Sequence, residues 1–101
     1  MSVRRGHAGR VDANHAQIVD ALRKVGISAT STAQIGGGFP DAAAGFRGVT
    51  LLLEIKSPGE KLNAAESEWH SKWGGAVAVV DSPESAINAV LDHAKKCGVL
   101  L

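Results

Sequence analysis

Residues 40–56 read PDAAAGFRGVTLLLEIK, and this stretch decides the fold. Two runs of small, β-branched and apolar residues, 42–46 and 49–56, flank Arg47 and Gly48, which predicts a β-hairpin. The second run contains three consecutive leucines, which occupy both of its faces. A strand that is apolar on both faces is usually covered on both sides, so we expect it to be central in its sheet.

The elements around the hairpin follow from hydrophobic spacing and from the positions of glycine and proline. The pattern predicts helices over 12–25, 63–73 and 83 to about 96, and strands over 27–34 and 76–80. The order αβββαβα puts a crossover helix between the hairpin and the last strand, and such crossovers join parallel strands. We therefore expect an α/β domain with a mixed four-stranded sheet, flanked by helices on both faces.

Length and composition fit one ordinary folded domain. The 101 residues are 45% apolar and 21% charged with a net charge of +1, so neither disorder nor overall attraction to nucleic acid is expected. The single cysteine excludes an internal disulfide and a four-thiolate zinc site. Without a membrane-length apolar run or a secretion signal, we expect a cytoplasmic protein with no membrane contact. We assign 1–10 to a loose basic N-terminus, 11–97 to the domain and 98–101 to an apolar tail.

The hairpin brings two acids together. If Arg47 and Gly48 form the turn, Asp41 lies directly opposite Glu54 on one face of the sheet. A four-residue turn would leave the two carboxylates as diagonal neighbours, still on that face. Lys56 follows Glu54 by two residues, so strand alternation places its ammonium group on the same face.

Two carboxylates beside one ammonium group predict a pocket of net negative charge. Mg²⁺ or Mn²⁺ would balance it, bound by Asp41, Glu54 and the main-chain carbonyl of Ile55. Such a metal activates water, and Lys56 can orient that water or offset charge in the transition state, which implies phosphodiester hydrolysis. Alternatively, Glu54 and Lys56 pair with neighbours on a half-exposed strand, and Asp41 simply follows Pro40 in a turn.

Pro40 and Asp41, followed by Glu54, Ile55 and Lys56, resemble the PD-(D/E)xK nuclease superfamily. More narrowly, the chain over roughly 10–90 resembles the small stand-alone VRR-NUC domains encoded by bacteriophages, in segments 36–41, 51–56, 62–69 and 77–80. The resemblance implies a restriction-endonuclease-like fold and a metal-dependent, structure-selective DNA endonuclease. Asp41 and Glu54 would be metal ligands and Lys56 the catalytic lysine. Similar small enzymes resolve DNA junctions as homodimers, so we expect branched DNA such as a Holliday junction as substrate.

Two positions depart from the family pattern. The family usually carries a glutamate in the first helix, where this chain has Gln17, and His15 is the rival for that position because it is in phase with the apolar stripe. In the second helix Glu66 stands where the family tends to have a glutamine. Glu66 falls on the apolar stripe of this helix, and a buried acid needs a partner. We therefore hypothesise that Glu66 restores to the site the negative charge that is lost where Gln17 replaces the family's glutamate. The alternative for Glu66 is a surface pair with a lysine.

The glutamine in the first helix keeps a second function open, that of a DNA-binding or assembly module whose nuclease site has decayed. Basic residues elsewhere are candidate DNA contacts, although most such residues only aid solubility. These candidates are Arg4, Arg5, Arg10, Arg47, Lys61 and Lys72. Trp69 and Trp73 share one helix face and are interpreted as packing residues rather than as a base-stacking platform. His93 and Cys97 have metal-ligand spacing, but no further His or Cys nearby supports a zinc site.

Overall fold

The computed structural model describes the backbone of residues 2–101 and the side chains from Ala13 onward. The elements are α1 (Ser2–Lys24), β1 (Ser28–Ser31), β2 (Ala42–Phe46), β3 (Val49–Ile55), α2 (Ala64–Lys72), β4 (Val77–Val80) and α3 (Pro83–Lys96). This order confirms the predicted αβββαβα pattern and the α/β class. None of the described helices has the length and apolar character needed to cross a membrane.

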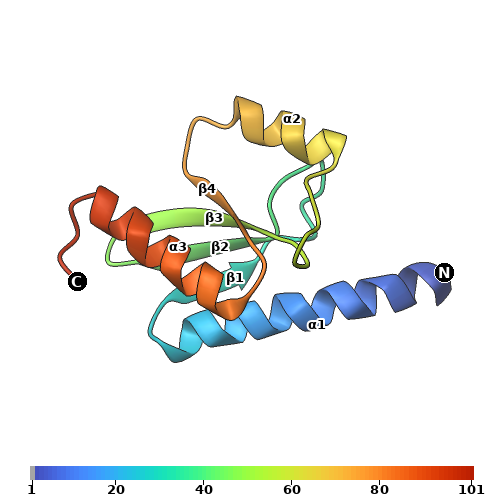
Figure 1. Ribbon diagram of the computed structural model, residues 1–101, viewed down its shortest axis with the longest axis horizontal. Helices are drawn as coiled ribbons and strands as arrows, with labels where there is room; N and C mark the ends of the chain where they lie inside the picture. The colour runs from blue at the N-terminus through green and yellow to red at the C-terminus, as the bar shows by residue number, and fades with distance from the viewer. Residues whose placement is uncertain (1) are drawn as a thin grey trace.

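The four strands form one mixed sheet in the order β1-β2-β3-β4 (Figure 1). β2 and β3 are antiparallel, with Ala42 opposite Leu53 and Phe46 opposite Val49, so the turn lies at Arg47 and Gly48 as predicted. β4 runs parallel to β3, as the crossover through α2 requires. Strand β3 is therefore internal to the sheet, which explains its leucine-rich sequence.

The two faces of β3 have different partners. Leu51, Leu53 and Ile55 point into the hydrophobic core, together with residues of α1 and α3 such as Leu22 and Val90. The intervening side chains point to the opposite face, where α2 lies. Figure 1 shows α1 and α2 on opposite sides of the sheet, with α2 at the top of the view. Alternation along one strand thus separates the core from a polar site beneath α2.

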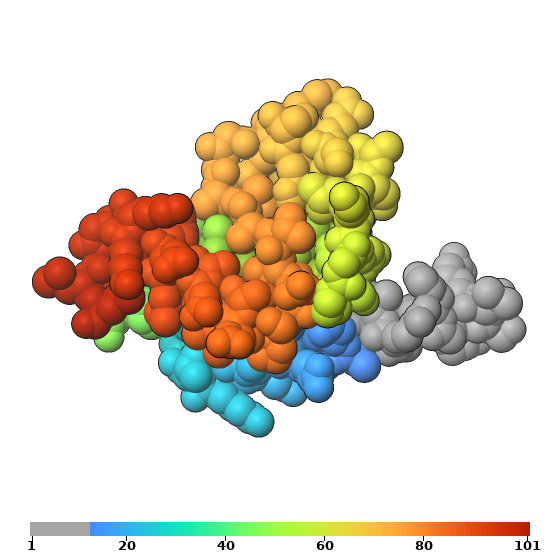
Figure 2. Space-filling view, in the orientation of Figure 1, coloured from blue at the N-terminus to red at the C-terminus, as the bar shows by residue number. Residues whose placement is uncertain are grey.

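Helix α2 is a surface element, because none of its residues is buried. A capping box fixes its start: the Asn63 side chain accepts a hydrogen bond from the Glu66 N–H, and the Glu66 side chain accepts one from the Asn63 N–H. The loop from β3 to α2 lies on the surface, in yellow-green in Figure 2, and α2 stands above it.

A glycine and an aromatic cluster attach α2 to the loop before β2. Gly38 has a φ of 84°, and a Cβ built on it would lie 3.0 Å from the Ala65 carbonyl oxygen and 3.1 Å from the Trp69 Cβ. Phe39 meets Trp69 edge-on at 5.2 Å, and Trp69 stacks on Trp73 at 4.6 Å between ring centroids. These contacts agree with the interpretation of the tryptophans as packing residues.

Helix α1 starts at Ser2, well before the start near Asp12 that the sequence predicted. No proline interrupts residues 2–12, so nothing in this stretch forces a break, although Gly6 and Gly9 disfavour helix and explain why the spacing did not predict one. The side chains of 1–12 lie outside the described part of the chain. The predicted basic arm with Arg4, Arg5 and Arg10 therefore stays a prediction.

Candidate active site

The end of the hairpin opposite its turn places Asp41 beside Glu54. The Asp41 N–H donates to the Leu53 carbonyl at 2.9 Å, so the pairing of β2 with β3 continues one residue beyond the strand. The Asp41 Oδ2 accepts a hydrogen bond from the Ile55 N–H at 2.8 Å. A main-chain donor thus holds the Asp41 carboxylate against β3, and the proximity predicted from the register is present.

Glu54 is an acid buried in the sheet. Its exposed fraction is 2%, and its Oε1 lies 3.1 Å from the His70 Nε2 of α2. Burial raises the pKa of Glu54 to about 8, helped by a hydrogen bond with the Asp41 side chain and by the negative charges of Asp41 and Glu66. The positive charge of Lys56 opposes this rise in pKa without cancelling it. Two neighbouring carboxyl groups therefore share a site that disfavours a second negative charge.

Lys56 points to the same face, and its ammonium group is held by acids. The Nζ atom lies 2.7 Å from the Glu66 Oε1 and 3.7 Å from the Glu60 Oε2. Burial alone would lower the pKa of Lys56, but the hydrogen bond and charge of Glu66 outweigh it and raise this pKa above its ordinary value. Burial would likewise raise the pKa of Glu66, but the hydrogen bond from Lys56 leads to a net lowering. Lys56 is therefore positively charged at neutral pH.

These side chains surround one cavity of about 260 Å³. Its lining residues include Asn14, Asp41, Glu54, Lys56, Glu60, Asn63 and Glu66. One lysine faces four carboxyl groups there, so the cavity is a favourable environment for a cation. Within the described residues, no group of three or more His, Cys, Asp and Glu side chains is placed so that it could hold a metal ion. The predicted ligand set differs from such a group, because it combines only two carboxylates, Asp41 and Glu54, with the main-chain carbonyl of Ile55.

Among the predicted support residues, the structure brings only Glu66 to the cavity. Gln17 is exposed on α1 and does not line the cavity. His15 does not line it either, and its Nε2 is buried without a hydrogen-bond partner in the described part of the chain. The first-helix residue at the site is Asn14, whose Nδ2 donates to the Lys56 carbonyl at 3.3 Å. The structure thus places Asn14, and not Gln17 or His15, at the cavity, because the phase of α1 on the sheet cannot be set from the apolar stripe alone.

The alternative for Glu66 was a surface pair with a lysine, and the structure shows the pair but not the surface position. Glu66 does bind a lysine, but that lysine is Lys56 inside the cavity, and the Glu66 side chain is 17% exposed. The hypothesis that Glu66 contributes negative charge to the site agrees with this position. Sequence reasoning missed His70 and Glu60. The spacing of Glu66 and His70, four residues apart on one helix face, was the signal available for His70.

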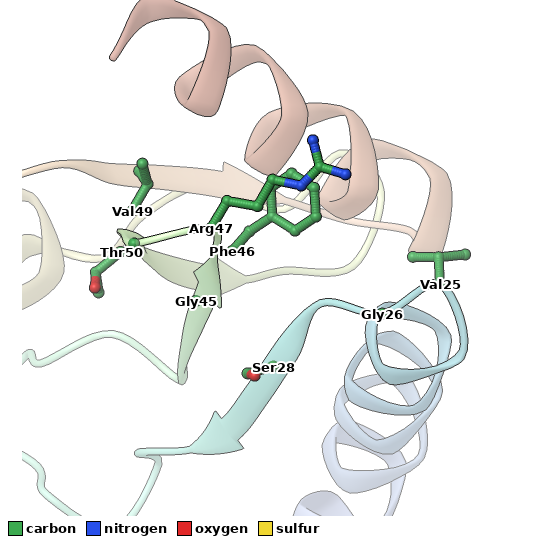
Figure 3. A pocket seen from close by; sticks show the side chains of 9 residues that line it. Val25, Gly26, Ser28, Gly45, Phe46, Arg47, Val49 and Thr50 are labelled. Carbon is green, nitrogen blue, oxygen red and sulfur yellow. The ribbon is translucent and has the colours of Figure 1, made fainter. Parts of the chain in front are cut away.

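Arg47 lies at the other end of the hairpin from the carboxylates. Its guanidinium group donates to the Leu100 carbonyl and stands 5.1 Å from the centroid of the Phe46 ring. Figure 3 shows the Arg47 side chain running across this ring, beside a pocket at the hairpin turn. Arg47 is thus remote from the predicted chemistry.

The other predicted DNA contacts are spread over the surface. Lys72 pairs with Glu68 at 2.9 Å on the exposed side of α2. Lys61 is exposed in the loop before α2 and does not line the cavity. His93 and Cys97 lie 3.7 Å apart through Nε2 and Sγ on α3, outside the cavity. None of these residues joins the carboxylate cluster.

Comparisons with models of protein families, with curated proteins and with solved structures found no match for this chain.

Proposed function

We propose that the protein is a Mg²⁺- or Mn²⁺-dependent endodeoxyribonuclease that hydrolyses phosphodiester bonds, with branched DNA such as a Holliday junction as its substrate. The observation that carries the proposal is the convergence of Asp41, Glu54 and Lys56 on one face of a sheet, around one cavity. The bacteriophage-type resemblance supports the substrate class and a location in the cytoplasm of a bacterial cell.

The donor set of the cavity fits a hard divalent cation. Carboxylate and carbonyl oxygens are the ligands that Mg²⁺ and Mn²⁺ prefer. Burial of Glu54 next to Asp41 raises the pKa of Glu54 to about 8, which marks a site where positive charge is lacking. Asp41, Glu54 and the carbonyl of Ile55 would hold the cation, which when bound would supply Lewis acidity and a more acidic water molecule.

Two contacts within the protein orient Asp41 and Lys56 for a phosphate. The Ile55 N–H holds the Asp41 carboxylate in place, which limits the reorganisation needed during reaction. Lys56 keeps its positive charge through Glu66, and that charge would stabilise the negative charge that develops on the phosphate. Lys56 must exchange the Glu66 carboxylate for a phosphate oxygen, so we infer that Glu66 holds the lysine between turnovers.

Branched DNA requires two cuts, and each chain offers one such cavity in its described part. We therefore propose a two-fold homodimer that presents two cavities to one junction. The resemblance to junction-resolving enzymes supports this assembly.

The decisive experiment measures nicking of a labelled four-way junction by the wild-type chain and by Lys56→Ala, with Mg²⁺, with Mn²⁺ and with EDTA. We expect wild-type cleavage with either metal, none with EDTA, and a loss of roughly 100-fold or more in the variant, because a positive group at developing charge is removed. Lys95→Ala is the matched control, since Lys95 is exposed on α3 and distant from the cavity lining.

Equal cleavage by wild type and Lys56→Ala would refute the assigned role of the lysine. Junction binding without cleavage by the wild-type chain, with either metal, would favour the DNA-binding module over the enzyme. Cleavage of plain duplex as fast as of the junction would contradict the substrate class alone.

A further inference from the structure

His70 is a half-buried imidazole that contacts Glu54, the most buried acid among the residues whose side chains the structure describes. The His70 side chain is 14% exposed, and its Nε2 lies 3.1 Å from the Oε1 of Glu54, which is 2% exposed. The ring also packs edge-on against Trp69, at 5.8 Å between centroids. Nε2 thus has a fixed direction, toward Glu54.

One face of α2 contacts Glu54 of β3 and Lys56, the residue directly after this strand. Glu66 and His70 are four residues apart on the helix, while Glu54 and Lys56 are two apart on the strand. Glu66 binds Lys56 at 2.7 Å and His70 binds Glu54 at 3.1 Å. The helix and the end of the strand therefore meet through two polar contacts in register.

We propose that His70 is a positioning residue for the cation site: its Nε2–H donates to one carboxylate oxygen of Glu54 and thereby turns the other toward Asp41 and the cavity. This inference depends on the proposed function, because it assumes that Glu54 is a cation ligand. A carboxylate without such a donor samples several side-chain orientations, and each orientation away from the cavity lowers the affinity for a cation. Hydrogen-bond donors behind metal ligands typically change affinity by about 10- to 100-fold.

The surroundings of His70 support a positioning role rather than ligation. The Nε2 atom faces Glu54 and is already within hydrogen-bond distance of it. His70 does not line the carboxylate cavity, which is bounded by Glu54 on that side. The imidazole therefore lies behind the predicted ligand, as seen from the cavity.

The test measures Mn²⁺ binding without DNA, by calorimetry and by the electron paramagnetic resonance signal of free Mn²⁺. We expect His70→Leu to weaken binding by about 10- to 100-fold, because its side chain fills the space without a donor. His70→Gln should restore most of the affinity, since its terminal amide can donate at about the same distance from the backbone. His70→Asn carries the same amide on a shorter side chain and should not restore it.

His93→Leu is the matched control, because it removes a histidine of α3 that contacts Cys97 and lies outside the cavity. It should leave Mn²⁺ affinity unchanged. If His70→Leu does not fold, the comparison of His70→Gln with His70→Asn decides the question by itself.

Three outcomes are distinguishable. Wild-type binding with equal affinity in the Leu, Asn and Gln variants would overturn the role of His70 and leave the proposed nuclease intact. Equal losses in the Gln and Asn variants would show that the imidazole ring is needed for packing and would also overturn the role. No Mn²⁺ binding by the wild-type chain would overturn the proposed cation site and the role of His70 with it.

Discussion

Glu54 combines the burial of a core residue with the chemistry of a site residue. It sits on a strand whose alternate side chains, Leu51, Leu53 and Ile55, point into the core, and its carboxyl group contacts His70 and Asp41. Its pKa of about 8 lies far above the 4.5 of an exposed glutamate. Without a bound cation, the folded chain therefore prefers Glu54 protonated over most of the physiological pH range.

This shift predicts a pH dependence of stability. Below pH 4.5 Glu54 is protonated in both the folded and the unfolded chain, so its full contribution to the free energy of unfolding is present. Between pH 4.5 and about 8 only the unfolded chain releases the proton, so wild-type stability falls, by on the order of a few kcal/mol in all. Glu54→Gln cannot titrate and should lose that part of the decline, as measured by urea unfolding in EDTA at several pH values.

Glu68→Gln is the control for this series, because Glu68 is a mostly exposed acid on α2. Its stability should follow the wild-type curve. Parallel curves for wild type and Glu54→Gln would contradict the raised pKa.

At the scale of single residues, the sequence predicted the site within one strand pair but not across elements. Asp41, Glu54 and Lys56 come together because hairpin register and strand alternation are local properties, readable from spacing. Asn14 and His70 reach the same region from α1 and α2. The orientation of each helix about its axis and its position along the sheet depend on tertiary packing, which local spacing does not show. Gln17 was expected at the site and Asn14 lies there instead, because no pattern within α1 predicts which turn of the helix contacts the end of β3.

At the scale of elements, α2 depends on a few contacts at its edges. It has no buried residue, and the capping box, Gly38 and the aromatic cluster hold it over the carboxylates. The position of Glu66 and His70 therefore depends on the loop before β2. The sequence predicted the helix and its caps but not this loop contact, which joins segments far apart along the chain.

Gly38→Ala should destabilise the fold more than Gly37→Ala does. Both glycines have a positive φ, a conformation in which a Cβ clashes with the backbone, so both variants are strained by about 1–2 kcal/mol. Only at Gly38 would the added methyl group meet neighbours, the Ala65 carbonyl at 3.0 Å and the Trp69 Cβ at 3.1 Å, whereas nothing lies within 4 Å at Gly37. Overpacking of this kind adds roughly 1–3 kcal/mol, which urea unfolding can measure.

The same pair of variants tests whether α2 serves the site. Gly38→Ala should also weaken Mn²⁺ binding relative to Gly37→Ala, because a displaced α2 moves His70 and Glu66. Equal unfolding free energies for the two variants would show that the loop yields without disturbing the helix.

Most element boundaries were predicted to within a few residues. The exception beside α1 is β1, which covers Ser28–Ser31 instead of 27–34. The Thr32 hydroxyl and N–H bind the backbone of Pro40 and Asp41, so the chain turns into the 33–38 loop earlier than the β-branched composition suggests. The end of β1 is thus fixed by hydrogen bonds to the residues just before β2, and the composition of 27–34 alone does not predict them.

At the scale of the whole molecule, the core and the site occupy opposite sides of one sheet. Helices α1 and α3 cover the core face, and α2 covers only part of the other (Figure 1). The radius of gyration of 13.6 Å is close to the ~13 Å expected for a compact chain of this length. If the proposed function holds, a molecule of this size with one such cavity in its described part suits one strand of a DNA branch rather than two.

The proposed homodimer gives a direct prediction for light scattering. At the concentrations used for cleavage we expect a mass of twice the 10.4 kDa of one chain, with or without Mg²⁺. Junction DNA should then receive two nicks within the lifetime of one complex. A monomeric mass at those concentrations, together with independent single nicks, would refute the dimer and leave the cavity chemistry unaffected.

Asp41, Glu54 and Lys56 all belong to one uninterrupted hairpin, from Asp41 to Lys56. The groups that the proposed chemistry uses are therefore encoded in one short, continuous stretch of sequence. Asn14 and His70 reach this region from two separate helices, so either contact can be changed by substitution while the hairpin keeps its acids and its lysine.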